Sequence, residues 1–235
     1  MRMTGRMVVG MLLIALIAGS SDAQVKDKRV QSDGKGWGYQ KAATTDAKLP
    51  RVLLIGDSIL NGYRRTVTQA LEGKANVDVW INPFHQNTAG LCDMLKEVLA
   101  NGPYDVIHFN MGLHGWPKGR IPEGKFEPLT QKYVQTMREN AQGASLIWAS
   151  STPVTAKGKP GELDPEINPI IMEHNAMAAK VMQANNIPIN DLYQLMASKL
   201  NLAKGDQFHW TTEGAVLQGQ AVAEAVLQAL RNRKR

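Results

Sequence analysis

Three residues of the types used in nucleophilic catalysis lie in two distant parts of the chain. Ser58 stands in the stretch GDS, directly after the apolar run RVLLIG, and His209 follows Asp206 by three residues in GDQFHW. A serine nucleophile needs a base to take its proton, and the base needs an acceptor that fixes its tautomer. The residue types and their spacing therefore predict Ser58 as the nucleophile, His209 as the base and Asp206 as the group that orients His209.

The same residues also have a structural interpretation. Ser and Asp are common N-caps, so Asp57 or Ser58 could simply cap a helix that starts at this point. His209 precedes a helix-like pattern and could be a helix-start residue. Because both stretches supply the members of one triad, each just ahead of a predicted helix, the catalytic interpretation is favoured.

The elements that must position these residues alternate along the chain. Apolar, strand-like runs occupy residues 51–56, 77–81, 104–110, 145–150 and 187–190. Helix-like segments occupy residues 61–71, 89–100, 129–140, 165–185, 191–200 and 211–231. Such alternation predicts an α/β fold with right-handed crossovers and a parallel sheet of about five strands, covered by helices on both faces. Ligands bind at the carboxyl ends of such strands, which is where Ser58 lies.

The first part of the chain differs from the rest in composition. Residues 1–23 hold two arginines, a short apolar run and then small residues, which is typical of a cleaved signal peptide; an uncleaved anchor is the less favoured alternative. Residues 24–48 are polar and rich in lysine, so we expect a linker or a loosely packed N-terminal arm. The catalytic domain is predicted over residues 49–235. The protein is therefore expected to be secreted or periplasmic, without a membrane attachment after cleavage.

Composition limits the remaining function classes. The 235 residues suit one catalytic domain, and Cys92 is the single cysteine, so we expect no disulfide. The net charge of +6 falls to +5 when residues 1–23, with two arginines and one aspartate, are removed. No interleaving of aromatic and basic residues accompanies this charge, so we expect no nucleic-acid partner. The five histidines show no HxxxH or HxH pattern, and we expect neither a metal nor another cofactor.

The two motifs resemble those of the SGNH or GDSL hydrolases. That family has its nucleophile in a GDS block after the first strand and its acid and base in a DxxH block before the last helix. The resemblance covers most of the chain from about Leu49 onward, and NNIPINDLY looks like the family's fifth-strand region. It implies a flavodoxin-like, three-layer α/β/α sandwich and an esterase whose triad is Ser58, Asp206 and His209.

The resemblance also implies an oxyanion hole, but here the sequence departs from the family pattern. The family uses a glycine after the second strand, and this chain has Asn87 at that position, with Gly90 three residues later. Asn87 is slightly favoured, because a backbone amide can serve whatever the side chain. The family also uses an asparagine in a G-x-N-D turn after the third strand. His114 occupies that position, and Asn110 lies four residues earlier; both remain candidates.

Two loops, residues 111–128 and 153–165, flank the expected site. Trp116 could stack on a sugar ring or could simply anchor its loop. We expect a secreted serine esterase that removes small acyl groups, most plausibly O-acetyl groups from carbohydrate. The alternatives are a lipase or thioesterase of the same family, or a catalytically silent carbohydrate-binding module on the same fold. No long apolar segment that could form a lid appears outside the predicted signal peptide.

Overall fold

The computed structural model describes residue 1, residues 27–43 and residues 45–233. The predicted signal peptide, residues 1–23, lies outside this part of the chain except for Met1. Within the described residues, no helix is long and apolar enough to cross a bilayer.

The secondary structure follows the predicted alternation of strands and helices. The strands are β1 (Gly38–Gln40), β2 (Arg51–Gly56), β3 (Asn76–Ile81), β4 (Val106–Phe109), β5 (Ser145–Ala149), β6 (Thr155–Ala156), β7 (Lys159–Leu163) and β8 (Ile189–Asn190). The α-helices are α1 (Ser58–Ala70), α2 (Leu91–Leu99), α3 (Phe126–Asn140), α4 (Ile167–Ala184), α5 (Leu192–Ala197) and α6 (Thr212–Arg233). Two short 3₁₀ helices, η1 (Leu113–Gly115) and η2 (Leu200–Leu202), lie in the loops.

The main sheet has the strand order β1-β3-β2-β4-β5-β8. Five of its strands run parallel to their neighbours, as predicted, and β1 adds an antiparallel edge beside β3. The chain leaves β2 for β3 on one side and then returns to β4 on the other. The carboxyl ends of β2 and β4 therefore form the switch point at which ligands bind in such sheets.

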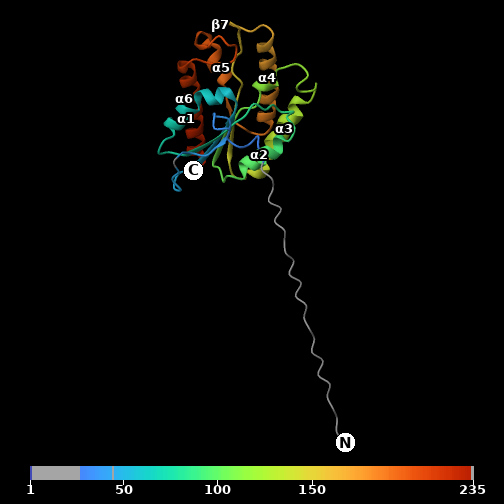
Figure 1. Cartoon of the computed structure of the whole chain (residues 1–235), viewed down its shortest axis with the longest axis vertical. Helices are drawn as coiled ribbons and strands as arrows, with labels where there is room; N and C mark the ends of the chain where they lie inside the picture. The colour runs from blue at the N-terminus through green and yellow to red at the C-terminus, as the bar shows by residue number, and fades with distance from the viewer. Residues whose placement is uncertain (2–26, 44, 234–235) are drawn as a thin grey trace.

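Helices cover both faces of the sheet, so the fold is a three-layer α/β/α sandwich (Figure 1). Helices α1 and α6 pack on one face, and α2, α3 and α4 pack on the other. Consecutive residues of β2 point to opposite faces: Leu54 joins the core under α1 and α6, whereas Leu53 and Ile55 join the core under α2 to α4. Burial on both faces explains why β2 reads as a continuous apolar run.

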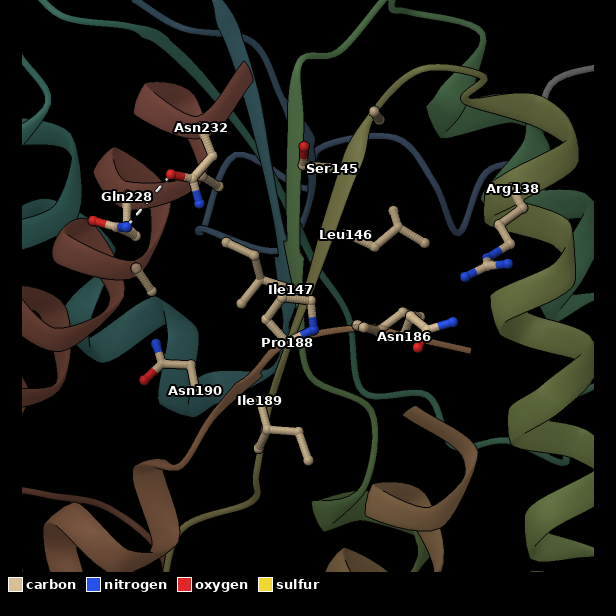
Figure 2. A pocket seen from close by; sticks show the side chains of 14 residues that line it. Arg138, Ser145, Leu146, Ile147, Asn186, Pro188, Ile189, Asn190, Gln228 and Asn232 are labelled. Atoms are coloured by element: carbon tan, nitrogen blue, oxygen red, sulfur yellow. Dashed lines mark hydrogen bonds between the residues drawn. The ribbon is translucent and has the colours of Figure 1, made fainter. Parts of the chain in front are cut away.

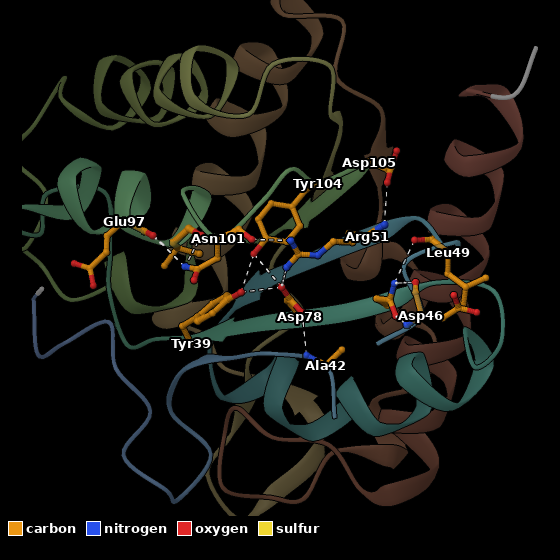
Figure 3. Close-up of polar contacts among 12 residues, drawn as sticks. Tyr39, Ala42, Asp46, Leu49, Arg51, Asp78, Glu97, Asn101, Tyr104 and Asp105 are labelled. Carbon is orange, nitrogen blue, oxygen red and sulfur yellow. Dashed lines mark hydrogen bonds and ion pairs between the residues drawn. The ribbon is translucent and has the colours of Figure 1, made fainter. Parts of the chain in front are cut away.

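The prediction of a linker or loosely packed arm over residues 24–48 needs correction. In the described part, β1 pairs with β3, and Val30 is buried in the core at 3% exposure. Asp78 holds this segment: its carboxylate accepts hydrogen bonds from the Tyr39 hydroxyl at 2.7 Å and from the Ala42 backbone N–H at 2.9 Å (Figure 3). Arg51 pairs with the same carboxylate. These partners are distant in the sequence, so local composition did not reveal them.

The predicted loop over residues 153–165 is also more ordered than expected. It forms the small hairpin of β6 and β7, apart from the main sheet. The hairpin contacts the loop that carries Asp206 and His209: the Thr155 N–H donates to the Gln207 carbonyl at 2.9 Å, and the Gly158 N–H donates to the Gly205 carbonyl at 2.9 Å. The hairpin therefore helps to position the second motif.

Candidate active site

Ser58 is the first residue of α1 and does not cap the helix. The cap is Asp57, whose side chain accepts a hydrogen bond from the Ile59 N–H at 2.8 Å. Asp57 is buried, which raises the pKa of its carboxyl group against the opposing effect of the Ile59 N–H and of the nearby His114. With the cap supplied by its neighbour, the Ser58 hydroxyl is free for another partner. The Ser58 N–H lies in the first helical turn, where N–H groups have no partner within the helix.

Gly56 allows the sharp passage from β2 into α1. A Cβ atom at this position would lie 2.8 Å from the Cβ of Leu60, closer than real Cβ contacts. The glycine is therefore required because helix and strand approach closely, and not for a left-handed backbone.

The structure brings the three predicted catalytic residues together although 151 residues separate Ser58 from His209. The Ser58 Oγ atom lies 2.9 Å from His209 Nε2, and His209 Nδ1 lies 2.9 Å from the Asp206 Oδ2 atom. Both distances are those of good hydrogen bonds. The arrangement is a continuous chain from hydroxyl to imidazole to carboxylate, which is the geometry of a serine hydrolase triad.

Asp206 orients His209 through the backbone as well as through the ring. Its Oδ1 atom accepts hydrogen bonds from the His209 N–H at 2.8 Å and the Phe208 N–H at 3.2 Å. Burial alone would raise the pKa of Asp206, but the hydrogen bonds from the His209 N–H and imidazole outweigh it and lower the pKa below its ordinary value. The group therefore stays ionised as an acceptor at neutral pH.

Gln207 is a residue of this site that the sequence did not reveal. Its backbone is left-handed, with φ at 83°, which is uncommon for a residue other than glycine. The Gln207 Nε2 atom donates to Asp164 Oδ2 at 3.0 Å, while the Thr155 N–H binds the Gln207 carbonyl. These two contacts hold a turn that lets His209 fold back over Asp206.

His114 lies beside the start of α1. Its Nε2 atom is 3.8 Å from the Asp57 Oδ2 atom, too far for a normal hydrogen bond. The same atom is buried and has no hydrogen-bond partner in the part of the chain that the structure describes. The Arg120 guanidinium donates to the His114 carbonyl at 2.7 Å and holds this loop. The ring nitrogen that faces Asp57, the residue before Ser58, thus has no hydrogen-bond partner among the described residues.

Asn110 occupies a different environment. Its side-chain Nδ2 donates to the Ala149 carbonyl at 2.7 Å and lies 3.3 Å from the Ser151 hydroxyl oxygen. Both N–H bonds of the amide are therefore engaged at the end of β5. The sequence left Asn110 and His114 as alternative oxyanion donors. The Asn110 amide nitrogen already has two partners, whereas the His114 Nε2 atom has none among the described residues.

The two donors predicted after β3, Asn87 and Gly90, have different surroundings in the structure. Asn87 is exposed, and its side chain donates to the Arg120 carbonyl at 3.1 Å, which links the loop after β3 to the loop after β4. Gly90 begins α2 with φ at 74°, and a Cβ there would approach Arg29 of the N-terminal segment. The Arg29 guanidinium donates to the neighbouring Ala89 carbonyl at 3.0 Å, so this turn lies against the N-terminal segment.

Asn82 was not singled out from the sequence. It directly follows β3, and its N–H donates to the Gly56 carbonyl at 2.9 Å, so it lies against the turn that carries Ser58. Its Oδ1 atom accepts from the Phe84 N–H, whereas its Nδ2 atom is buried without a hydrogen-bond partner among the described residues. The signal available in the sequence was the Asn-Pro pair at the end of a strand.

An aromatic pair spans the two loops beside the triad. The rings of Trp116 and Phe208 stack with centroids 6.4 Å apart and an angle of 28°. Phe208 precedes His209, and Trp116 lies two residues after His114, so the pair couples the two loops. One face of Trp116 is thus in contact with protein, which supports the interpretation that it anchors its loop.

A cavity of about 310 Å³ opens beside the triad between α1 and α6; we call it the α1–α6 cavity. It is lined by Ser58, Ile59, Asn61, Gly62, Lys204, His209, Trp210, Ala215 and Gln218. A larger groove of about 650 Å³ lies at the amino-terminal half of β5, where residues 145–147 pair with β4 on one side but the short β8 does not reach them on the other (Figure 2). This groove is at the end of the sheet opposite to Ser58, so it is not part of the triad site.

The remaining histidines have structural surroundings. His108 is buried in β4 beside Asn190, and burial lowers its pKa to about 4. His174 stacks on Phe126 with ring centroids 4.3 Å apart. Burial also lowers the pKa of His85. Among the described residues, no group of three or more His, Cys, Asp or Glu side chains is arranged to hold a metal ion.

Comparison with known proteins identifies the fold. No family profile and no curated sequence matches the chain. Among solved structures, a lipase/acylhydrolase from Enterococcus faecalis matches with a TM-score of 0.60 and 20% identity, over 76% of this chain and 95% of that protein. An acetyl xylan esterase matches with a TM-score of 0.60 and 18% identity, over 75% of this chain and 99% of that one. A carbohydrate acetylesterase family member from Sinorhizobium meliloti matches with a TM-score of 0.59 and 15% identity, over 77% and 99% of the two chains. The chain therefore has the fold of the SGNH/GDSL hydrolases that its two motifs resemble.

Proposed function

We propose that this protein is a serine esterase that works through an acyl-enzyme intermediate. The observation that carries the proposal is the hydrogen-bonded chain from the Ser58 hydroxyl through His209 to Asp206, with both distances at 2.9 Å. A helix cap or a helix-start histidine would not require this alignment of three side chains from opposite ends of the domain. The similar folds of acylhydrolases and acetyl esterases support the same reaction class.

In the proposed mechanism, the Ser58 oxygen attacks the ester carbonyl carbon while His209 Nε2 takes the hydroxyl proton. Asp206 keeps the other ring nitrogen protonated and stabilises the imidazolium that forms. His209 then gives the proton to the leaving alcohol oxygen, and the acyl group remains on Ser58. A water molecule then attacks the acyl-enzyme carbonyl carbon while His209 takes its proton. His209 returns this proton to the Ser58 oxygen as the bond to the acyl group breaks and the carboxylic acid leaves.

The negative charge that develops on the carbonyl oxygen needs hydrogen-bond donors. We assign the Ser58 N–H and His114 Nε2 to this role, with the Asn87 N–H as the third donor. Support comes from the first turn of α1, which offers its free N–H groups, and from the uncommitted ring nitrogen of His114. Asn110 is left out because its amide already binds Ala149 and Ser151.

For the substrate we propose short acyl esters, with O-acetyl groups on carbohydrate as the natural class. The names of two similar structures, an acetyl xylan esterase and a carbohydrate acetylesterase family member, support this choice. The pattern of residues 1–23 supports export, because polymeric carbohydrate is met outside the cytoplasm. We accordingly propose a secreted or periplasmic enzyme.

The test is hydrolysis of a short aryl acetate by the purified protein and by its Ser58→Ala variant. We expect turnover by the wild type and a loss of about 10³-fold or more in the variant, with an unchanged circular dichroism spectrum. Near wild-type turnover by Ser58→Ala would refute the assignment of the nucleophile. A wild type with no ester turnover that still binds acetylated polysaccharide would instead indicate a silent binding module.

A further inference from the structure

The orientation of the triad determines on which side of Ser58 an ester places its alcohol. His209 Nε2, which lies 2.9 Å from Ser58 Oγ, must give its proton to the leaving oxygen. The carbonyl oxygen must instead face the oxyanion donors near His114. The alcohol part of the ester therefore extends past His209, and not toward the loop after β4.

The α1–α6 cavity lies where the alcohol must go, because Ser58 and His209 both line it. Its first wall comes from α1, where Ser58, Asn61 and Gly62 stand three and four positions apart and share one face of the helix. Its second wall comes from Ala215 and Gln218, which are three positions apart on α6.

The cavity ends where the two helices meet. A Cβ at Gly219 would lie 2.6 Å from the Cβ of Thr66, so α1 and α6 are in direct contact just beyond Gln218. The volume of about 310 Å³ is at the lower end of the range for ligand pockets and equals that of about ten water molecules. An acetyl group would leave most of it empty, whereas one sugar-sized ring fits it.

The lining combines apolar surface with hydrogen-bonding groups. Trp210 and Ile59 supply apolar surface, and the Asn61 amide and the Lys204 ammonium supply polar groups. Gln218 is 1% exposed; its Nε2 donates to the Gly214 carbonyl, and its Oε1 has no hydrogen-bond partner among the described residues. The Asn61 amide can donate and accept, and the Lys204 ammonium can donate, so the lining can form hydrogen bonds with the hydroxyls of a ligand.

We propose that the α1–α6 cavity receives the alcohol part of the ester, a ring-sized group that carries hydroxyls, such as a single glycosyl unit. The acyl group stays outside this cavity, on the opposite side of Ser58. This inference rests on the esterase function proposed above and adds to it the place where the alcohol is selected.

Gly62 provides the means to test the proposal. A Cβ added there meets no atom within 4 Å, and its φ is not left-handed, so a larger side chain can enter the cavity without a backbone clash. The variants are Gly62→Leu, which fills the cavity, and Gly62→Ala, which adds one methyl group. Gly161→Leu on the exposed β7 is the control, because Gly161 also has open space around its Cβ.

Three substrates distinguish effects on the acyl group from effects on the alcohol. Relative to methyl acetate, methyl butyrate has a longer acyl group, and a mono-O-acetylated methyl pyranoside has a larger alcohol. We expect Gly62→Leu to lower kcat/KM on the acetylated pyranoside at least 10-fold more than on methyl acetate. The ratio between methyl butyrate and methyl acetate should stay within 2-fold of the wild type. Gly161→Leu should leave both ratios of kcat/KM at their wild-type values. Gly62→Ala should give a ratio between the acetylated pyranoside and methyl acetate that is intermediate between those of Gly62→Leu and the wild type.

Gly62→Leu could instead change the ratio of kcat/KM between methyl butyrate and methyl acetate and leave the ratio between the acetylated pyranoside and methyl acetate unchanged. This result would mean that the cavity holds the acyl group, and it would overturn the proposal. Two unchanged ratios would overturn it as well, as would a wild type that hydrolyses methyl acetate but not the acetylated pyranoside. If Gly62→Leu does not fold, Ala215→Leu fills the cavity from the α6 wall and is judged by the same ratios. Failure of the esterase function itself would show separately, as absent wild-type turnover of methyl acetate.

Discussion

Replacement of His114 by alanine tests the part of the site in which this chain departs most from the family pattern. The His114 Nε2 atom is buried, lacks a hydrogen-bond partner among the described residues, and lies 3.8 Å from Asp57 Oδ2. The substitution therefore removes no hydrogen bond from Nε2 to any described residue of the resting protein. If the ring donates to the oxyanion in the transition state, its loss should raise the barrier by about 3 to 4 kcal/mol, or about 10²- to 10³-fold in kcat.

Asn110→Ala is the matched control, since Asn110 was the competing donor. Its amide lies 2.7 Å from the Ala149 carbonyl and 3.3 Å from the Ser151 hydroxyl, and each such bond contributes about 1 kcal/mol to stability. We therefore expect Asn110→Ala to lower the free energy of unfolding by about 1 to 3 kcal/mol and to retain most of the kcat of the folded enzyme. His114→Asn, which returns the residue of the family pattern, should recover part of the lost activity.

The assay is kcat on a short aryl acetate at neutral pH, together with urea unfolding of each variant. A large loss of kcat in Asn110→Ala, with little loss in His114→Ala, would show that the donor lies at the end of β4 and that the reasoning is wrong. If neither variant loses kcat, the oxyanion is held by backbone N–H groups alone.

Two further predictions concern the triad and the core. Asp206→Asn should reduce kcat by about 10³- to 10⁴-fold with little change in KM, because an amide cannot hold His209 in the required tautomer; steady-state kinetics measure this, and a loss below 10-fold would contradict the role of Asp206. Buried His108 has a folded-state pKa of about 4 against 6.5 for the unfolded chain, so the unfolded state binds more protons between these pH values. Its contribution to stability, about 3 kcal/mol, should be complete above about pH 6.5 and fall away as the pH drops toward 4. Urea unfolding at pH 7.5 and 4.5 should therefore show a smaller pH dependence in His108→Leu than in the wild type, and equal pH dependence would count against this account.

The sequence by itself determined the five parallel strands, the six α-helices and the place of the two motifs. Apolar runs and helical periodicity are local properties, and the strand RVLLIG appears in the structure with the predicted bounds, Arg51–Gly56. The GDS and DxxH stretches were found because each carries its residues within four positions of the chain. Alternation of strand and helix then restricts the topology to a parallel sheet, which places the ends of the strands at one edge.

Only the tertiary structure decided which polar groups are free and which are engaged. Asn110 and His114 were equal candidates in the sequence, and they differ because Asn110 meets residues 39 and 41 positions away, at the end of β5. The same holds for β1, whose pairing with β3 and contact with Asp78 are absent from its local composition. Hydrogen-bond partners and cavities depend on contacts between distant segments, so the uncommitted His114 nitrogen and the α1–α6 cavity became visible only when the chain was folded.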